Sequence, residues 1–149
     1  MRYPRVTGTG AEISGSLNTV EIGKGVVRRQ GEKIAFFAFG SMVETALQAT
    51  ENLNATVADM RFVKPLDIDL IKDLATTHDY LITIEENSKK GGAGAAVLEV
   101  LSDLRIVKPL LILGIPDIVT AHGDAKLIWQ DLGLDADSVE KRVKAFVGE

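Results

Sequence analysis

Cysteine is absent from this 149-residue sequence, and histidine occurs only twice, as His78 and His122. The lack of thiols excludes a disulfide framework and a thiolate metal site. The two histidines lie far apart, without the short spacing of paired metal ligands. We therefore expect this chain to bind no metal ion.

Long apolar runs and a strong charge of one sign are also missing. No run approaches the roughly 20 apolar residues that span a bilayer, and the start of the chain does not lead into the apolar core of a signal peptide. The formal net charge is −4 with both signs interspersed, which argues against a nucleic-acid surface. These absences predict a cytoplasmic protein that contacts neither membrane nor nucleic acid.

The sequence does contain enough apolar residues for a core. They make up 46% of the chain, which suits one compact domain. Residues 33–39 are too few for a helix and too continuously apolar for a half-exposed strand, so we expect a strand buried on both faces of a parallel sheet. Ser41 with Glu44 then forms a capping-box pattern, and an apolar stripe at helical spacing begins at Met42. The unit is a strand, a tight turn and a helix.

Strand and helix patterns alternate along the rest of the chain. Short connections between them predict an open three-layer α/β/α domain with right-handed crossovers. Residues 26–30 and the turn Gly31-Glu32 suggest a hairpin with the first buried strand, which makes the sheet mixed, with one antiparallel strand. Further strands are expected at residues 55–60, 80–84 and 110–113, and helices are expected after Asp67, from Gly91 to Gly94 onward, and at about 124–132 and 137–147.

The first 25 residues differ in composition from the rest. Between Tyr3 and Ser16, glycines, serines and threonines with one proline predict extended or looping backbone. Such a segment has few apolar side chains to bury. We expect residues 1–25 to form an interdomain arm or linker, and residues 26–149 to form the domain.

Polar residues cluster where the parallel strands are expected to end, which is where open sheets bind ligands. The cluster Gly91-Gly92-Ala93-Gly94 could hold an anion at a helix N-terminus. The alternative is that small residues let the helix pack closely on the sheet or on a neighbouring subunit. We favour this alternative because neither a Gly-x-Gly-x-x-Gly nor a Walker pattern is present.

Three further candidates have two interpretations each. Glu85 and Glu86 point to opposite faces if the strand continues, so they cannot pair as acid and base. Either one is functional, or, as we favour, one caps a helix or pairs across an interface while the other is solvated. Asp59 and Arg61 either position a substrate or, as we favour, pair to hold the strand-to-helix turn. His122 is either a general acid or base, or, as we favour, an exposed or interface histidine.

Two arginines, Arg2 and Arg5, flank Tyr3-Pro4 at the amino end. On extended backbone held by the proline they could present a guanidinium fork to a phosphate or carboxylate, or they could serve solubility alone. From its residues alone, the chain is a soluble α/β domain with polar strand ends and no self-sufficient catalytic set.

Several strings carry a resemblance to a known family. They are Arg2-Tyr3-Pro4-Arg5, Ile22-Gly23-Lys24-Gly25, Leu53-Asn54-Ala55-Thr56, the nine residues from Asp59 to Asp67, Glu85-Glu86-Asn87 with Gly91-Gly92-Ala93-Gly94, and Gly114-Ile115-Pro116-Asp117. Over essentially the whole chain, the sequence resembles the carboxyl-terminal domain of the 1-deoxy-D-xylulose-5-phosphate synthases, within the transketolase family. The resemblance implies a mixed five-stranded sheet with residues 26–30 antiparallel at one edge and residues 33–39 central.

The resemblance also implies an activity. Enzymes of this family use thiamine diphosphate to condense pyruvate with glyceraldehyde 3-phosphate, release carbon dioxide and supply precursors of isoprenoids, thiamine and pyridoxal. Their cofactor and Mg²⁺ are held by preceding domains, so the resemblance implies no catalytic, cofactor-binding or metal-binding residue here. Arg5 alone matches a functional position, the one that contacts the substrate phosphate. The implied partners are the preceding domains of the same polypeptide and the second subunit of a homodimer.

The sequence departs from the family at three places. Val6 stands where a glycine is usual, Ser88-Lys89-Lys90 replaces a more apolar stretch, and the loop at residues 117–123 varies, so His122 is not assigned a role. Two hypotheses follow. The chain is the third domain of a transferase and is inactive alone, or it is a stand-alone module that uses the same fold to bind small anions or a protein partner.

Overall fold

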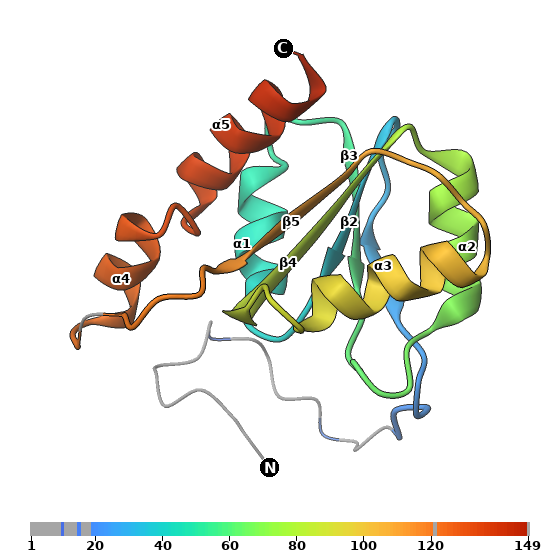
Figure 1. Ribbon diagram of the computed structural model, residues 1–149, viewed down its shortest axis with the longest axis horizontal. Coiled ribbons are helices and arrows are strands. Elements are labelled where there is room, and N and C mark those ends of the chain that lie inside the picture. Colours follow the sequence, from blue (N-terminus) through green and yellow to red (C-terminus); the bar gives the residue numbers. More distant parts are fainter. Residues whose placement is uncertain (1–9, 11–14, 16–18, 121, 149) are drawn as a thin grey trace.

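Strand β2 (Ile34–Ala38) lies at the centre of the sheet and is buried along its whole length (Figure 1). The computed structural model describes residues 19–120 and 122–148, together with Gly10 and Gly15. All five side chains of β2 are shielded from solvent because helices cover both faces of the sheet. The strand predicted from its continuous apolar run is therefore confirmed.

The sheet has five strands in the order β1-β3-β2-β4-β5. Both β3 and β4 run parallel to β2, and β5 runs parallel to β4, whereas β1 is antiparallel to β3. The mixed sheet with one antiparallel edge strand is confirmed. The bounds are β1 (Val26–Arg29), β3 (Ala55–Asp59), β4 (Tyr80–Ser88) and β5 (Leu110–Ile115).

The hairpin expected between residues 26–30 and β2 is wrong. Strand β1 pairs with β3, where Val27 lies opposite Ala58, and β3 separates β1 from β2. The Gly31 N–H donates to Thr56 Oγ1 at 3.0 Å, so the chain crosses the amino end of β3 instead of turning back beside β1. A side chain at Gly31 would overlap the backbone of Ala55. This glycine therefore permits a close crossing that resembles a turn in the sequence.

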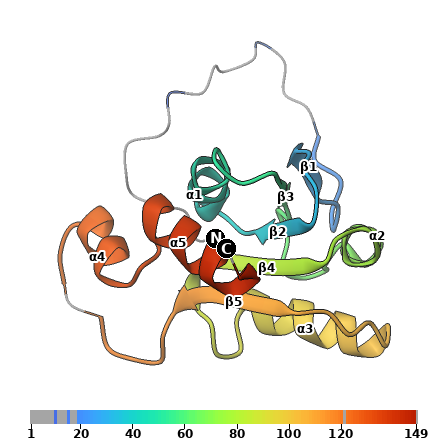
Figure 2. The same cartoon turned by 90° about the horizontal axis from the view of Figure 1, so that it is seen from above.

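Helices cover the two faces of the sheet and form two separate cores (Figure 2). Helices α1 (Met42–Ala49) and α5 (Ala136–Val147) pack on one face, and α2 (Ile68–Thr77) and α3 (Ala93–Asp103) pack on the other. A shorter helix, α4 (Ala125–Asp131), precedes α5. Phe36 faces the first core and Phe37 the second, because successive side chains of a strand alternate between faces. The predicted three-layer α/β/α fold is confirmed.

Much of the predicted arm lies outside the described residues. The structure leaves out residues 1–9, 11–14 and 16–18, and with them Arg2 and Arg5.

Within the described part of the chain, no helix is long and apolar enough to cross a membrane.

Asp67 joins the approach to β1 to the start of α2. Its Oδ1 accepts a hydrogen bond from the Leu70 N–H at 3.1 Å, which is the helix cap predicted from the sequence. Its Oδ2 accepts from the Gly25 N–H at 3.0 Å, and Oδ1 lies 3.4 Å from Lys24 Nζ. Lys24 also pairs with Asp69 at 3.1 Å. We name the contacts of Asp67 with Lys24, Gly25 and Leu70 the Asp67 clamp.

The clamp predicts acid-sensitive stability. Burial by itself raises the pKa of the Asp67 carboxyl, but hydrogen bonds from Leu70, Gly25 and Lys24 outweigh it and hold the pKa below its ordinary value. The clamp therefore contributes stability above about pH 4, the ordinary pKa of aspartate, and loses it as pH falls through the lower folded-state pKa. We expect Asp67→Ala to lower the free energy of unfolding by about 2 kcal/mol at pH 7, with the difference from wild type shrinking below about pH 4.

Urea denaturation across this pH range measures the effect, and Asp69→Ala is the matched control. The Asp69 side chain is 88% exposed, so its removal should cost less than about 1 kcal/mol. Equal losses in the two variants would assign the stability to the ion pairs of Lys24 and not to the backbone hydrogen bonds that Asp67 accepts from Gly25 and Leu70.

Candidate functional site

The carboxyl ends of β2 and β4 meet where the chain leaves the sheet in opposite directions. Helix α1 follows β2 onto one face, whereas α3 follows β4 onto the other. The next strands, β3 and β5, lie on opposite sides of the β2–β4 pair. In open α/β sheets, ligands bind at such a point. We define the switch point as Gly40, Ser41, Glu85 and Glu86, which occupy these two strand ends.

Glu85 caps the amino end of α3. Its two carboxylate oxygens accept hydrogen bonds from the backbone N–H groups of Ala93 and Gly94, both at 2.9 Å. The side chain is buried, and the N-cap residue Gly92 has no side chain to perform this role. The favourable interaction between an anion and a helix N-terminus is thus satisfied inside the protein. The anion-site interpretation of Gly91–Gly94 is wrong for this reason.

The glycines of this cluster allow close packing, as the favoured alternative predicted. A Cβ on Gly94 would lie 2.5 Å from Thr83 Oγ1 on β4 and 2.6 Å from Ile112 Cγ2 on β5. A Cβ on Gly92 would overlap the Ser88 carbonyl oxygen and the Glu85 carboxylate. The first turn of α3 therefore sits against the sheet at a distance that only glycine permits.

Glu86 points to the other face and meets the start of α1. The Ser41 hydroxyl donates a hydrogen bond to the Glu86 carboxylate, and Ser41 makes no side-chain cap to its own helix. The capping box expected from Ser41 and Glu44 is therefore wrong, because the hydroxyl is used across the sheet. The prediction that Glu85 and Glu86 face opposite ways and form no acid/base pair is confirmed. Both carboxylates accept hydrogen bonds from groups of the domain itself, so these contacts at the switch point are structural.

The loop after β3 is stabilised by a hydrogen bond between a backbone N–H and a carboxylate, and not by an ion pair between Asp59 and Arg61. The Arg61 N–H donates to Asp59 Oδ1 at 3.1 Å, and Arg61 has a φ of 58°. This contact is an Asx-type turn, which stabilises a tight change of direction. Asp59 does hold the turn, as expected, but through the backbone of Arg61 and not through its guanidinium group. Arg61 itself is an exposed residue.

Exposed charges occupy the region beyond β4 and β5. Lys90 Nζ pairs with Asp117 Oδ2 at 3.0 Å, and both side chains are largely exposed. Such a pair contributes at most about 1 kcal/mol. His122 is also exposed, in the loop before α4. The structure supports the favoured interpretation of His122 as a surface histidine.

A buried histidine at the opposite edge was missed by sequence reasoning. His78 ends α2, with Nε2 2.8 Å from Thr56 Oγ1 and Nδ1 3.0 Å from the Leu74 carbonyl oxygen. Its own carbonyl oxygen accepts from Lys108 Nζ at 2.8 Å. These bonds join α2 to β3 and to the approach to β5, so the role is structural. No local pattern predicts it, because Thr56 lies 22 residues away in sequence.

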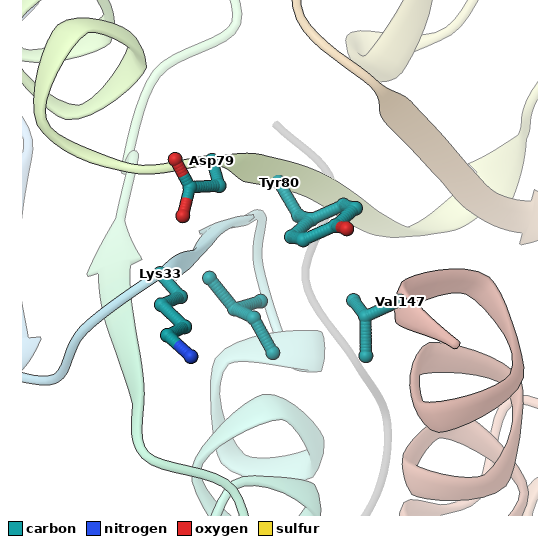
Figure 3. A pocket seen from close by; sticks show the side chains of 5 residues that line it. Lys33, Asp79, Tyr80 and Val147 are labelled. Carbon is teal, nitrogen blue, oxygen red and sulfur yellow. The ribbon is translucent and has the colours of Figure 1, made fainter. Parts of the chain in front are cut away.

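Two shallow depressions also lie at this amino edge. One, of about 210 Å³, has Lys33 and Asp79 on one side and Tyr80 and Val147 on the other (Figure 3). The second, of about 290 Å³, is lined mainly by Asn52, Asn54 and their neighbours. Both are open and lie at the end of the sheet opposite the switch point. Ligands of open parallel sheets bind at the carboxyl ends instead.

The substrate-binding role expected for Arg5 falls on a residue outside the described part of the chain. Within the described part, no group of three or more histidine, aspartate or glutamate side chains is arranged to hold a metal ion.

Removing the Glu85 carboxylate should destabilise the domain. Glu85→Ala would leave the Ala93 and Gly94 N–H groups buried without an acceptor, so we expect a loss of about 2 kcal/mol in the free energy of unfolding. Chemical denaturation of the isolated chain measures it. Glu99→Ala, at an exposed position of the same helix, should change stability by less than about 0.5 kcal/mol. Similar losses in both variants would show that the carboxylate does not close the helix.

Comparison with known proteins gives the family. The profile of the transketolase carboxyl-terminal domain matches residues 23–139. The chain is 60% identical over 149 residues to 1-deoxy-D-xylulose-5-phosphate synthase from Neisseria meningitidis serogroup B, covering 100% of this chain and 23% of that protein. It is 54% identical over 153 residues to the synthase of the same name from Cupriavidus taiwanensis, covering 99% of this chain and 24% of the relative. The chain thus spans about a quarter of the length of the curated relatives it matches.

Solved structures agree in fold. A structure described as a split gene transketolase in an inactive beta4 tetramer superposes with a TM-score of 0.79 at 31% identity, covering 87% of this chain and 44% of that one. Transketolase from Campylobacter jejuni superposes with a TM-score of 0.59 at 16% identity, covering 83% of this chain and 18% of the other, which shows the shared fold alone. The resemblance noted in the sequence is confirmed. The chain belongs to the transketolase carboxyl-terminal domain family.

Proposed function

We propose that this chain is the carboxyl-terminal domain of a 1-deoxy-D-xylulose-5-phosphate synthase. The observation that carries the proposal is the 60% identity to the Neisseria meningitidis synthase along all 149 residues. In the whole enzyme, the bond between the carboxylate and the carbonyl carbon of pyruvate breaks and carbon dioxide leaves. The carbonyl carbon then bonds to the aldehyde carbon of glyceraldehyde 3-phosphate, whose oxygen takes up a proton.

The described residues do not fit the cofactor of this reaction. Thiamine diphosphate supplies a carbon centre that stabilises the negative charge left by decarboxylation. A diphosphate needs free N–H donors, such as those of a helix N-terminus, but at α3 these donors hold Glu85. The described part of the chain also offers no side-chain group for Mg²⁺. These observations support binding of thiamine diphosphate and Mg²⁺ by the preceding domains.

The proposal includes further properties that the family resemblance implies. The whole enzyme is a cytoplasmic homodimer that supplies precursors of isoprenoids and thiamine. Residues 1–25 connect the preceding domain to this one, which residues 26–149 form. The isolated chain is inactive. A related split gene transketolase structure is itself described as inactive, which supports this last point. The alternative of a stand-alone module that binds small anions or a protein partner is not favoured by any contact at the switch point.

The test compares the full-length protein with the isolated chain. With thiamine diphosphate and Mg²⁺, the full-length protein should release carbon dioxide from pyruvate in step with 1-deoxy-D-xylulose 5-phosphate formation when glyceraldehyde 3-phosphate is present. The isolated chain should show neither turnover nor calorimetric binding of thiamine diphosphate, because a cofactor acts only where the protein binds and orients it. Micromolar cofactor binding by the isolated chain would contradict the proposal.

Arg5 should affect one substrate and not the other. A charge-assisted hydrogen bond to a phosphate dianion contributes about 1.5–3 kcal/mol, so Arg5→Ala in the full-length protein should raise KM for glyceraldehyde 3-phosphate about ten- to hundredfold. The KM for pyruvate should barely change. Arg2→Ala, in the same string, is the matched control and should leave both constants nearly unaltered. An unchanged KM for the aldehyde in Arg5→Ala would remove Arg5 from the site.

A further inference from the structure

Oxygen atoms surround the imidazole ring of His78, at the end of α2. Its Nε2 nitrogen lies 2.8 Å from Thr56 Oγ1, and its Nδ1 nitrogen lies 3.0 Å from the Leu74 carbonyl oxygen and 2.9 Å from Thr77 Oγ1. His78 is only 6% exposed, and Thr56 is fully buried. Because the Thr56 hydroxyl is shielded from water, the protein alone must satisfy it. The protons of this group are therefore placed by the neighbouring protein atoms.

The neighbours of Nδ1 favour a proton on this nitrogen. The Leu74 carbonyl oxygen can only accept a hydrogen bond, so it requires a donor at Nδ1. Thr77 Oγ1 donates to the Asp73 carbonyl oxygen at 2.8 Å, which leaves a lone pair of the hydroxyl to face the ring. Proton positions follow from such networks. A neutral His78 ring should therefore carry its single proton on Nδ1.

The other neutral form of the ring fits these contacts less well. With the proton on Nε2, the lone pair of Nδ1 would face the Leu74 oxygen at 3.0 Å, where the two groups repel. The Thr77 hydroxyl would also have to turn away from Asp73 to give Nδ1 a donor. An N–H group at Nδ1 makes an ordinary hydrogen bond at the same distance. The form with the proton on Nδ1 needs neither change.

The Thr56 hydroxyl has more acceptors around it than it has protons. Its oxygen accepts from the Gly31 N–H at 3.0 Å and donates to the Gly31 carbonyl oxygen at 3.1 Å. Nε2 of His78 is its third neighbour, at 2.8 Å. A hydroxyl carries one proton, so it cannot donate to the Gly31 carbonyl and to an unprotonated Nε2 at the same time. The charge of the ring therefore decides which bond is made.

We propose that protonation of His78 controls the hydrogen bonding of Gly31, where the chain crosses from β1 to β2. The neutral ring takes the Thr56 hydroxyl proton at Nε2. A ring that has gained a second proton from solvent donates at Nε2 instead, and the hydroxyl turns to the Gly31 carbonyl oxygen. Histidine suits this role because its charge changes near neutral pH in most settings. The inference concerns the amino edge of the sheet and does not rest on the proposed function.

The crossing responds to this change because Thr56 holds both backbone groups of Gly31. The Gly31 N–H and carbonyl oxygen meet the same hydroxyl, and a side chain at Gly31 would overlap the backbone of Ala55. The next residue, Glu32, donates its N–H to the Asn54 carbonyl oxygen at 2.8 Å in either state. Loss of the bond to the Gly31 carbonyl should therefore loosen Gly31 without releasing the crossing.

Charged residues lie on the elements around the ring, but its hydrogen-bond partners are uncharged. Lys108, in the approach to β5, donates to the carbonyl oxygen of His78 and not to the ring. Within the described part of the chain, no ion pair joins the ring to the exposed charged residues on α2, after it and in the crossing, which are Lys72, Asp73, Asp79, Glu32 and Lys33. The direction of the Thr56 hydroxyl thus depends on the ring itself.

Nitrogen and carbon NMR of the wild-type chain tests the proposal. In the neutral ring, the ¹⁵N resonances should show a protonated Nδ1 and an unprotonated Nε2. As the pH falls and the ring gains its second proton, the ¹³C resonance of the Gly31 carbonyl should move downfield in step, because this carbonyl gains a donor. A neutral ring with its proton on Nε2 would overturn the proposal. So would a ring that does not titrate in the folded chain, or a Gly31 resonance that stays constant while the ring titrates.

The variants at Thr56 separate the hydroxyl from packing. Thr56→Val replaces the hydroxyl by a methyl group and should abolish the response of the Gly31 carbonyl, whereas Thr56→Ser keeps a hydroxyl and should retain it. His122→Gln removes the second of the two histidines, an exposed one, and should leave the response unchanged. A response that persists in Thr56→Val, or one that disappears in His122→Gln, would refute the proposal. If Thr56→Val does not fold, the wild-type and Thr56→Ser spectra decide.

Discussion

Burial of β2 on both faces is the constraint on which this domain depends. A strand with no polar side requires a helical layer on each face of the sheet. The chain meets this requirement by sending α1 to one face and α3 to the other. The connections after β2 and β4 therefore lead to opposite sides of this strand pair. As a result, Ser41, Glu85 and Glu86 lie at adjacent strand ends. The position of the candidate site is thus a consequence of how the core is covered.

The carboxylates near this edge serve the backbone of the domain itself. Glu85 satisfies the first N–H groups of α3 from a neighbouring strand, and Asp67 does the same for α2 while holding Gly25. Helix N-termini attract anions, and here the protein supplies those anions. The amino ends of α2 and α3 therefore have little spare capacity to bind an external anion.

Local patterns predicted the elements but not the long-range contacts. The continuous apolar run of β2 and the cap at Asp67 were predictable because each depends on neighbouring residues. The pairing of β1 with β3 was not predictable from local sequence. Gly31-Glu32 has the composition of a hairpin turn, but the deciding partner of Gly31, Thr56, lies 25 residues away. The capping box failed for a similar reason, because Glu86 lies 45 residues from Ser41 and takes its hydroxyl. The two-residue period did predict that Glu85 and Glu86 face apart, but not which helix each one meets.

Helix α5 carries the carboxyl terminus to the edge opposite the switch point. Val147 lines the same depression as Lys33 and Tyr80, which stand at the amino ends of β2 and β4 (Figure 3). A five-residue strand is roughly 17 Å long at about 3.3 Å per residue, so the two edges are separated by at least that length. A fluorophore or affinity tag attached after residue 149 would leave the switch point unobstructed. A domain immobilised through that tag would present the switch point to the solution.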